Sequence, residues 1–395
     1  MTTVHIGWRS CCAVVALVLV ACGSAAPPAG RPGAASQAAS VGPAGSSPGS
    51  SSLASAVAKP GAAVNGSQVP EAISGSVGST AASTPPASSP KALSQSKLRF
   101  AIPVSSGLQV LPQLAQEAGY FKDQGLDVTI AQIPGSQEVI AALHSGDLDM
   151  ANSDSPSVIQ AHLSAIPTEI LAVPVTKPIF DFMVPAGITK PQDLAGKAVA
   201  VTKVCDSTCF QVTRAMQSWG LKPQQDVKLL PLQDYPGMFA GLRSNQVSGA
   251  PLAPPFNFQA QKIGFHSLAD LSQLPIEYPT AVVQAIQPFT TAHPDTVAAF
   301  LRAYVKTIHR YKSDEAFTVN VYRKFLKSDD TQVIEDTWNY YQRLLHDDPT
   351  PTVEGVKFVL DSLAETGNQK AKAANPADFI EPRFMEQVKA GRASL

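Results

Sequence analysis

Alanine, serine, glycine and proline are concentrated in one N-terminal stretch of this chain, and that stretch limits which part can fold. Residues 23–90 consist almost entirely of these four residue types, lack aromatic side chains and carry three charged residues. Such a segment cannot bury enough apolar surface to offset its chain entropy, so we expect a disordered tether over residues 22–95. The folded part is therefore predicted to span residues 96–395, and the 44% hydrophobic content of the chain is enough for a sizeable core.

The residues before this tether are typical of an export signal. Residues 13–21 (AVVALVLVA) form an apolar run, which is too short to span a bilayer core of about 20 residues. The run ends in Leu19-Val20-Ala21-Cys22, which resembles the bacterial lipobox, in which the cysteine after the cleavage site is acylated. We expect residues 1–21 to be a lipoprotein signal peptide and Cys22 to carry the lipid. An ordinary cleaved signal peptide is the alternative.

Two cysteines remain in the predicted folded part, Cys205 and Cys209. They form an even pair in an oxidising compartment. Their spacing of four would place them on one face of a helix within disulfide reach. A disulfide between them and two buried thiols are both compatible with the sequence.

The folded part alternates strand and helix signals. Residues 98–175 contain four short apolar strands separated by three helical periods, and residues 197–250 repeat the alternation with three strands and two helices. This pattern predicts an α/β fold of two βαβ lobes, each with a largely parallel sheet. Residues 281–286 form a strand that can return to the first lobe, and helical periods dominate afterwards.

These patterns predict the following boundaries. Lobe 1 begins with residues 96–178, lobe 2 covers residues 179–279, and residues 280–395 return to lobe 1 and end in a helical C-terminal tail.

Composition and motifs exclude several functions. Charged residues make up 15% of the chain and the formal net charge is −1, with no basic stripe, so we expect no nucleic-acid binding. The predicted folded part has no G-x-S-x-G, H-E-x-x-H or phosphate-loop string, and the histidines show no ligand spacing. We therefore expect no catalytic residues, no metal and no cofactor.

Three segments, in order, carry a family resemblance: EAGYFKDQGLDV at 117–128, AALHSGDLDMA at 141–151 and DLAGK at 193–197. Together they resemble the nitrate/sulfonate/taurine-type substrate-binding proteins of ABC transporters, a family that includes thiamine-pyrimidine synthase-like proteins. The resemblance covers residues 97–288. It implies a type II periplasmic binding protein fold, with two α/β lobes joined by crossover strands and a solute cleft between the lobes.

In open α/β sheets, ligands bind beyond the carboxyl ends of the strands, where helix N-termini offer N–H groups. Three loops rich in hydroxyl groups occupy such positions. We expect ligand contacts from Ser105, Ser106, Gly107, Asn152, Ser153, Asp154, Ser155, Cys205, Ser207 and Thr208. Helix N-capping alone is the alternative explanation for Ser and Asp at these places.

The nature of the solute stays open at this stage. The charged residues of the three loops, Asp154 and Asp206, are acidic, so a neutral or heteroaromatic solute is as compatible as a sulfonate- or nitrate-like anion. Lys203 can meet an anion or remain solvated. The side chains that can form a stacking face or pack in the core are Tyr235, Phe239, Phe256 and Phe258.

The resemblance implies an extracytoplasmic, lipid-anchored monomer that binds a small solute and delivers it to an ABC permease in the cytoplasmic membrane. One alternative is a pyrimidine-precursor synthase-like enzyme, but that branch carries a cysteine-rich iron motif, which this sequence lacks. A membrane-tethered sensor domain is the other alternative. We predict that the protein is not an enzyme.

Overall fold

The computed structural model of the chain describes residues 96–104, 106–203 and 206–392. These residues belong to a compact unit that begins at Pro90. Several expectations lie outside the described residues. They are the signal peptide, the lipid on Cys22, the tether, and the ligand contacts of Ser105 and Cys205. The choice between a Cys205–Cys209 disulfide and two thiols also lies outside the described residues, because Cys205 is not among them.

Lobe 1 is built on a five-stranded sheet with the strand order β2-β1-β3-β10-β4. Its strands are β1 (Ser96–Ile102), β2 (Leu126–Gln132), β3 (Met150–Ser153), β4 (Thr168–Ala172) and β10 (Val282–Ile286). Strands β2 and β3 pair with β1 in parallel, but β10 is antiparallel to both β3 and β4. The expectation of a largely parallel sheet is therefore wrong for β10. The chain enters this strand directly from lobe 2, at the sheet edge where β1 and β3 end, and so runs in the opposite direction.

Lobe 2 has a different sheet structure from the one predicted. A three-stranded sheet has the order β8-β5-β9 with antiparallel pairing, while β6 and β7 form a parallel pair. The bounds are β5 (Asp181–Val184), β6 (Ala198–Val201), β7 (Lys228–Pro231), β8 (Ala250–Leu252) and β9 (His266–Asp270). The sequence patterns did not predict β5 or β9, and these two strands make the sheet of lobe 2 less parallel than expected.

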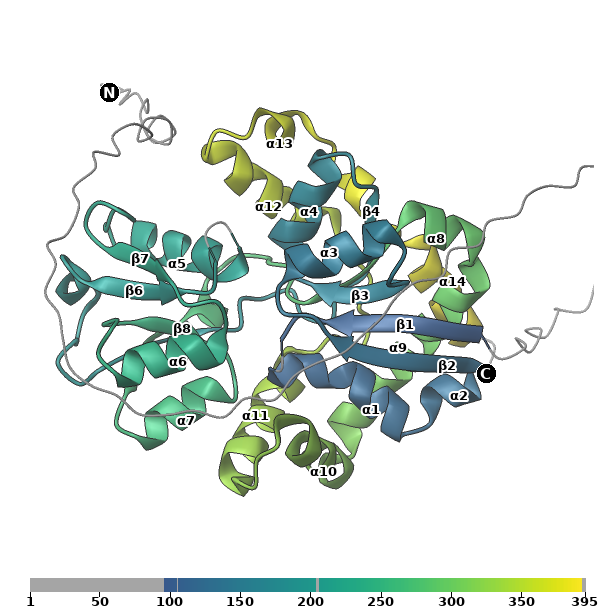
Figure 1. Cartoon of the computed structure of the whole chain (residues 1–395), viewed down its shortest axis with the longest axis horizontal. Coiled ribbons are helices and arrows are strands. Elements are labelled where there is room, and N and C mark those ends of the chain that lie inside the picture. The colour runs from purple at the N-terminus through teal and green to yellow at the C-terminus, as the bar shows by residue number, and fades with distance from the viewer. Residues whose placement is uncertain (1–95, 105, 204–205, 393–395) are drawn as a thin grey trace, which may run out of the picture. The chain divides into compact units, whose positions relative to one another are not determined.

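The helices surround both groups of strands (Figure 1). In the first part of lobe 1 and in lobe 2 they are α1 (Leu111–Glu117), α2 (Tyr120–Asp123), α3 (Ser136–Ser145), α4 (Ser155–Leu163), α5 (Ser207–Ser218), α6 (Tyr235–Arg243) and α7 (Phe256–Lys262). After β10 they are α8 (Gln287–Ala292), α9 (Pro294–Ser313), α10 (Glu315–Leu326), α11 (Thr331–Leu344), α12 (Val353–Glu365), α13 (Gln369–Ala373) and α14 (Arg383–Arg392). Short 3-10 turns are η1 (Gly107–Val110), η2 (Pro191–Leu194), η3 (Leu271–Gln273) and η4 (Pro376–Phe379). No helix among the described residues has both the length and the apolar character needed to cross a membrane.

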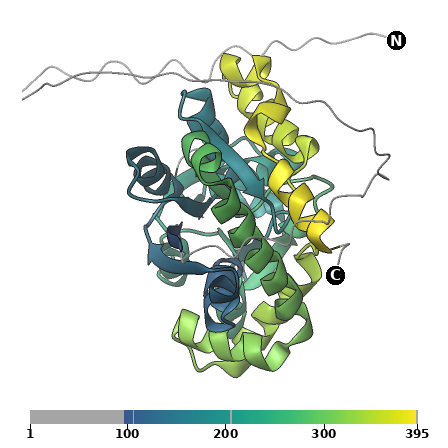
Figure 2. The ribbon, with the colours of Figure 1, turned by 90° about the vertical axis from the view of Figure 1, so that its right-hand side faces the viewer.

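The helix α9 is part of the core of lobe 1 and not of a peripheral tail (Figure 2). The ring of Phe300 is fully buried and stacks on Phe100 of β1 at 4.9 Å and on Phe121 of α2 at 5.2 Å. The apolar face of α9 therefore covers the sheet formed by the first strands, although about 200 residues separate them in the sequence.

Two chain segments cross between the lobes, one from β4 to β5 and one from β9 to β10. They run antiparallel beside each other, joined by a bridge between Val175 and Thr280. The Thr280 N–H donates to the Val175 carbonyl at 2.8 Å, and the Tyr278 N–H donates to the Thr176 carbonyl at 2.8 Å. This pair of segments is the connection about which the lobes can hinge.

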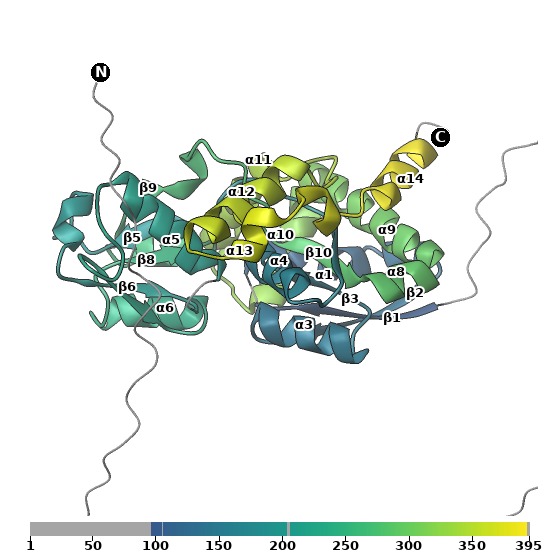
Figure 3. The same cartoon turned by 90° about the horizontal axis from the view of Figure 1, so that it is seen from above.

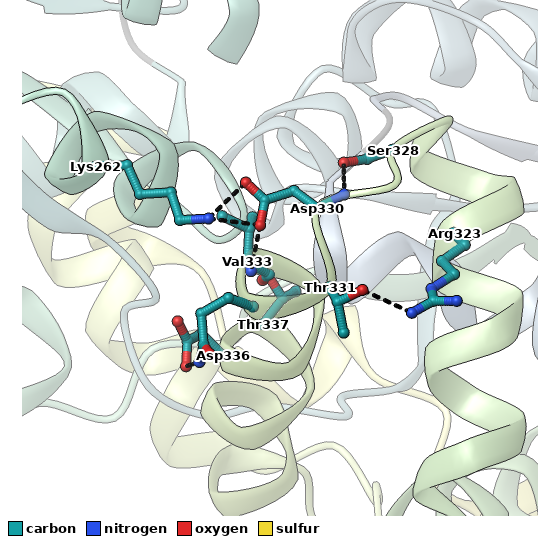
Figure 4. Close-up of polar contacts among 9 residues, drawn as sticks. Lys262, Arg323, Ser328, Asp330, Thr331, Val333, Asp336 and Thr337 are labelled. Atoms are coloured by element: carbon teal, nitrogen blue, oxygen red, sulfur yellow. Dashed lines mark hydrogen bonds and ion pairs between the residues drawn. The ribbon is translucent and has the colours of Figure 1, made fainter.

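The C-terminal helices also contact lobe 2, on two sides. In the view of Figure 1, α12 lies above and α11 below, and seen from above the two overlap (Figure 3). On one side Arg214 of α5 pairs with Glu365 of α12 at 2.8 Å. On the other side Lys262 of α7 pairs with Asp330 at 2.6 Å, and Asp330 in turn caps α11 by accepting from the Val333 N–H (Figure 4).

Candidate functional site

A cleft with a volume of about 520 Å³ lies between the two lobes. Lobe 1 lines it with the segments that follow β1, β2 and β3, and lobe 2 lines it with the segments that follow β6 and β7. The crossover segments add Ile179, Phe180, Thr280 and Ala281. Every strand that leads into the cleft presents its carboxyl end, which is the place where open α/β sheets bind ligands.

Five of the residues expected to contact ligand line this cleft: Ser106, Ser153, Asp154, Ser207 and Thr208. They come from both lobes. Ser105 and Cys205 lie outside the described residues, so their positions stay predictions.

Three other expected contacts are not among the residues that line the cleft. Gly107 packs against α11, and a Cβ atom on it would lie 2.4 Å from Tyr341 Cε2. Asn152 is fully buried and its Nδ2 donates to Gln109 Oε1 at 2.7 Å. Ser155 is also fully buried. Asn152 lies within β3, and Gly107 and Ser155 follow strands that end at the cleft, but all three are buried in the protein interior, which the sequence pattern does not reveal.

Of the helices that begin at the cleft, α3 follows Gly135 and has no side-chain cap, whereas α4, α5 and α6 are each capped by an aspartate. Asp154 accepts from the Ser157 N–H of α4 at 3.0 Å, Asp206 from the Cys209 N–H of α5 at 3.0 Å, and Asp234 from the Gly237 N–H of α6 at 2.7 Å. In each case the carboxylate accepts a hydrogen bond from the backbone N–H of the third residue of the helix, as an N-cap residue does. The capping alternative therefore accounts for Asp154 and Asp206, and it places a negative charge at each of the three helix starts.

The carboxylate of Asp206 organises the loop of lobe 2. Besides capping α5 it accepts from the Lys203 N–H at 3.0 Å, from Thr208 Oγ1 at 2.7 Å and from Thr202 Oγ1. Thr208 Oγ1 in turn accepts from the Thr202 N–H at 2.8 Å. The hydroxyl of Thr208, expected to bind ligand, is thus committed to bonds within its own loop.

Lys203 pairs with a carboxylate across the cleft while remaining partly exposed to solvent. Its ammonium lies 2.8 Å from Glu138 Oε1 and 3.0 Å from Oε2. Because Lys203 belongs to lobe 2 and Glu138 to α3 of lobe 1, this ion pair spans the cleft. Hydrogen bonding from Lys203 lowers the pKa of Glu138. Both side chains are substantially exposed, so such a pair contributes only about 0–1 kcal/mol to stability.

Several residues of the cleft, notably Gln109, Glu138 and Asp234, were not predicted from the sequence. Asp234 stands at a strand–loop–helix junction like the three that were used, so the same rule would have found it. Phe180 was not detectable in this way because it precedes β5, a strand that the patterns did not predict.

An aromatic pair forms one wall of the cleft. Tyr235 meets Phe180 edge to face, with ring centroids 5.8 Å apart. Burial, and then the charges of Asp206 and Asp154, raise the pKa of Tyr235 far above its usual value, so its phenol stays protonated. The other predicted stacking residues, Phe239, Phe256 and Phe258, are not among the lining residues and pack against the hydrophobic cores.

The described residues contain no cluster of three or more His, Cys, Asp or Glu side chains arranged to hold a metal ion.

Among known proteins with similar sequences are a periplasmic binding protein and a biosynthetic enzyme. The chain is 27% identical over 195 residues to the taurine-binding periplasmic protein of Escherichia coli K12, a match that covers 49% of this chain and 60% of that protein. It is 29% identical over 114 residues to the 4-amino-5-hydroxymethyl-2-methylpyrimidine phosphate synthase THI11 of Saccharomyces cerevisiae, a match that covers 28% of this chain and 33% of that enzyme. The sequence matches thus span less than two thirds of either relative.

The fold is that of periplasmic binding proteins. The alkanesulfonate-binding protein SsuA from Xanthomonas axonopodis pv. citri, solved with bound MOPS, superposes with a TM-score of 0.62 at 17% identity. The superposition covers 72% of this chain and 98% of that protein.

One protein family matches the sequence directly. The family described as NMT1/THI5 like matches residues 113–314, which is just over half of the chain. That range includes the strands and helices that build most of the cleft. The chain therefore belongs to the NMT1/THI5-like family.

Proposed function

We propose that this protein is the solute-binding component of an ABC importer and acts outside the cytoplasmic membrane as a lipid-anchored monomer. It captures a small molecule in the cleft, closes around it, and presents the closed form to the permease. The observation that carries this proposal is the cleft itself, which is lined from both lobes at the carboxyl ends of their strands. A ligand that contacts both lobes stabilises the closed state over the open one, because only the closed state makes both sets of contacts.

The similar proteins suggest two solute classes. Taurine- and alkanesulfonate-binding relatives favour a sulfonate- or nitrate-like anion, whereas the pyrimidine synthase relatives favour a small heteroaromatic molecule. The synthase match is also compatible with the alternative function, a pyrimidine-precursor synthase-like enzyme on the same scaffold. The match to synthases covers little more than a quarter of the chain, so the binding role is the better supported one.

Ligand-induced closure tests the proposal. The purified protein is screened against a library of small solutes by thermal shift, and each hit is followed by small-angle X-ray scattering. A binding protein of this type should show a smaller radius of gyration with its solute and should leave that solute chemically unchanged. A hit that the protein converts to a product would instead support the enzyme, and a library that never closes the lobes would contradict the binding role.

Ser106 provides a variant for the same test. Its side chain is buried in the cleft wall and makes no capping bond to η1, so Ser106→Ala should fold normally. If its hydroxyl bonds the solute, its loss should reduce affinity roughly five- to 150-fold in calorimetry. The exposed Ser244→Ala in lobe 2 is the matched control and should bind as the parent does. Equal affinities of the two variants would remove Ser106 from the binding site.

The lipid anchor has its own test, since it depends on the sequence at Cys22. Cys22→Ser should abolish labelling by a radioactive or clickable fatty acid and should release the protein from the membrane fraction. Cys12→Ser, within the predicted signal peptide, is the matched control and should leave membrane association unchanged. Membrane association that survives Cys22→Ser would rule out acylation at this residue as the anchor.

A further inference from the structure

The charged side chains that line the cleft are predominantly acidic. The acidic ones are Glu138, Asp154, Asp206 and Asp234, and Lys203 is the only basic one among the lining residues that the structure describes. The ammonium of Lys203 is held by both carboxylate oxygens of Glu138. The cleft therefore offers a solute no free cationic side chain from its described walls.

Most helix N-termini at the cleft do not supply the missing positive charge. The start of α3 has no side-chain cap but has Glu138 in its first turn, and the other three starts are capped by carboxylates. The starts of α4, α5 and α6 carry the carboxylates of Asp154, Asp206 and Asp234, each bonded to an N–H of its own helix. A carboxylate in this position already interacts with the positive end of the helix dipole, where an anionic ligand would otherwise bind. A sulfonate or nitrate entering this cleft would approach three negatively charged carboxylates. It would not replace any of them at its helix N-terminus.

Asp154 retains capacity to accept further hydrogen bonds. Its carboxylate accepts from the Ser157 N–H at 3.0 Å, from Ser157 Oγ at 2.8 Å and from the side chain of Ser136, whereas the two oxygens of an ionised carboxylate can together accept about four bonds. Asp206, by contrast, already accepts four. Burial, and then the charge of Asp206, raise the pKa of Asp154. The two carboxylates therefore repel each other, and a cation bound in the cleft would relieve that repulsion.

The apolar part of the wall complements this acidic end. Phe180 and Tyr235 meet edge to face, and Leu108 and Ile179 also line the cleft. A volume of about 520 Å³ is within the range of roughly 300–1,000 Å³ that is usual for small-molecule sites. The site therefore combines acceptors for a positively charged group with a surface for a compact apolar body.

We propose that the solute of this cleft is a small organic cation, in which an ammonium or amidinium group is carried by a compact apolar or aromatic body. The charged group binds Asp154 and the body packs on Phe180 and Tyr235. This inference rests on the proposed solute-binding function, and it excludes a sulfonate or nitrate as the preferred ligand.

A matched series of probes tests the charge directly. Benzamidine, benzamide and benzoate share one ring and carry a cationic, a neutral and an anionic group. We expect benzamidine to raise the melting temperature of the purified protein most, benzamide less, and benzoate, taurine and nitrate not at all. Failure of benzamidine to bind, or stronger binding of benzoate, taurine or nitrate, would overturn the inference.

Asp154→Asn removes the negative charge of this side chain but keeps its ability to cap α4. Asparagine is as good an N-cap as aspartate, so α4 should form normally, and removing a buried charge should maintain or raise the melting temperature without ligand. Loss of one charge-assisted hydrogen bond should weaken benzamidine binding roughly ten- to 100-fold. Asp314→Asn, which alters the capping aspartate of α10 in lobe 1, is the matched control and should bind benzamidine normally.

Glu138→Gln tests the ion pair across the cleft. It frees the ammonium of Lys203, so we expect weaker binding of benzamidine and measurable binding of benzoate. Unchanged benzamidine affinity in both Asp154→Asn and Glu138→Gln would overturn the assignment of these carboxylates. If benzoate or taurine closes the lobes in scattering, the charge inference fails while the binding function stands; if nothing closes them, the binding function itself fails.

Discussion

Replacing Phe300 with alanine is expected to reduce the free energy of unfolding by about 3–5 kcal/mol, the range for a buried phenylalanine whose site cannot fully collapse. The ring is fully buried between Phe100 and Phe121, and its removal would leave a cavity between α9 and the sheet of lobe 1. Urea denaturation followed by circular dichroism measures the change as a shift of the unfolding midpoint.

Phe325→Ala is the matched control because Phe325, on α10, is only partly buried. It should cost about 1 kcal/mol or less, since little apolar surface becomes newly exposed. Equal effects of the two substitutions would contradict the conclusion that α9 is an integral part of the lobe 1 core.

Replacing Asp206 with alanine is expected to destabilise the protein by about 2–4 kcal/mol and to abolish measurable solute binding. The change removes the cap of α5 and leaves the Lys203 N–H and the hydroxyls of Thr202 and Thr208 without their acceptor. The loop that forms the lobe 2 side of the cleft would then lose its defined conformation. Thermal unfolding gives the stability change, and calorimetry with a solute identified in the closure screen gives the affinity.

Asp234→Ala serves as the stability control for this prediction. Asp234 also caps a cleft helix, but within the described residues its carboxylate accepts a hydrogen bond only from the Gly237 N–H. A simple cap costs about 1 kcal/mol. A comparable small loss in Asp206→Ala would mean that the loop does not depend on the four-bond arrangement.

The sequence alone determined much of the local structure. Helices lie where the sequence shows helical periods, among them α4 (Ser155–Leu163), α6 (Tyr235–Arg243) and α10 (Glu315–Leu326). These helices are preceded by Asp154, Asp234 and Asp314, and each of these caps its helix. Capping and apolar periodicity act within a few residues, so they are visible in the sequence itself.

The family resemblance predicted the overall architecture of the protein, which local patterns alone do not specify. The GYF and GLDV strings, together with the SGDLDMA and DLAGK segments, indicated the binding-protein fold, and the match to the NMT1/THI5-like family confirms that recognition. The rule that ligands bind beyond strand carboxyl ends directed attention to the loops that border the cleft, but it did not separate Ser153 and Asp154, which line it, from Asn152 and Ser155, which do not.

Tertiary structure alone decided the remaining features. The antiparallel direction of β10, the packing of Phe300 on Phe100, and the ion pair between Lys203 and Glu138 each join residues that are 65 to 200 positions apart. No local pattern specifies such a partner, because it depends on how the lobes fold back on each other. The chemistry of the cleft depends on the same long-range folding. It pairs Lys203 with Glu138 and brings the capping carboxylates of Asp154, Asp206 and Asp234 to one cavity.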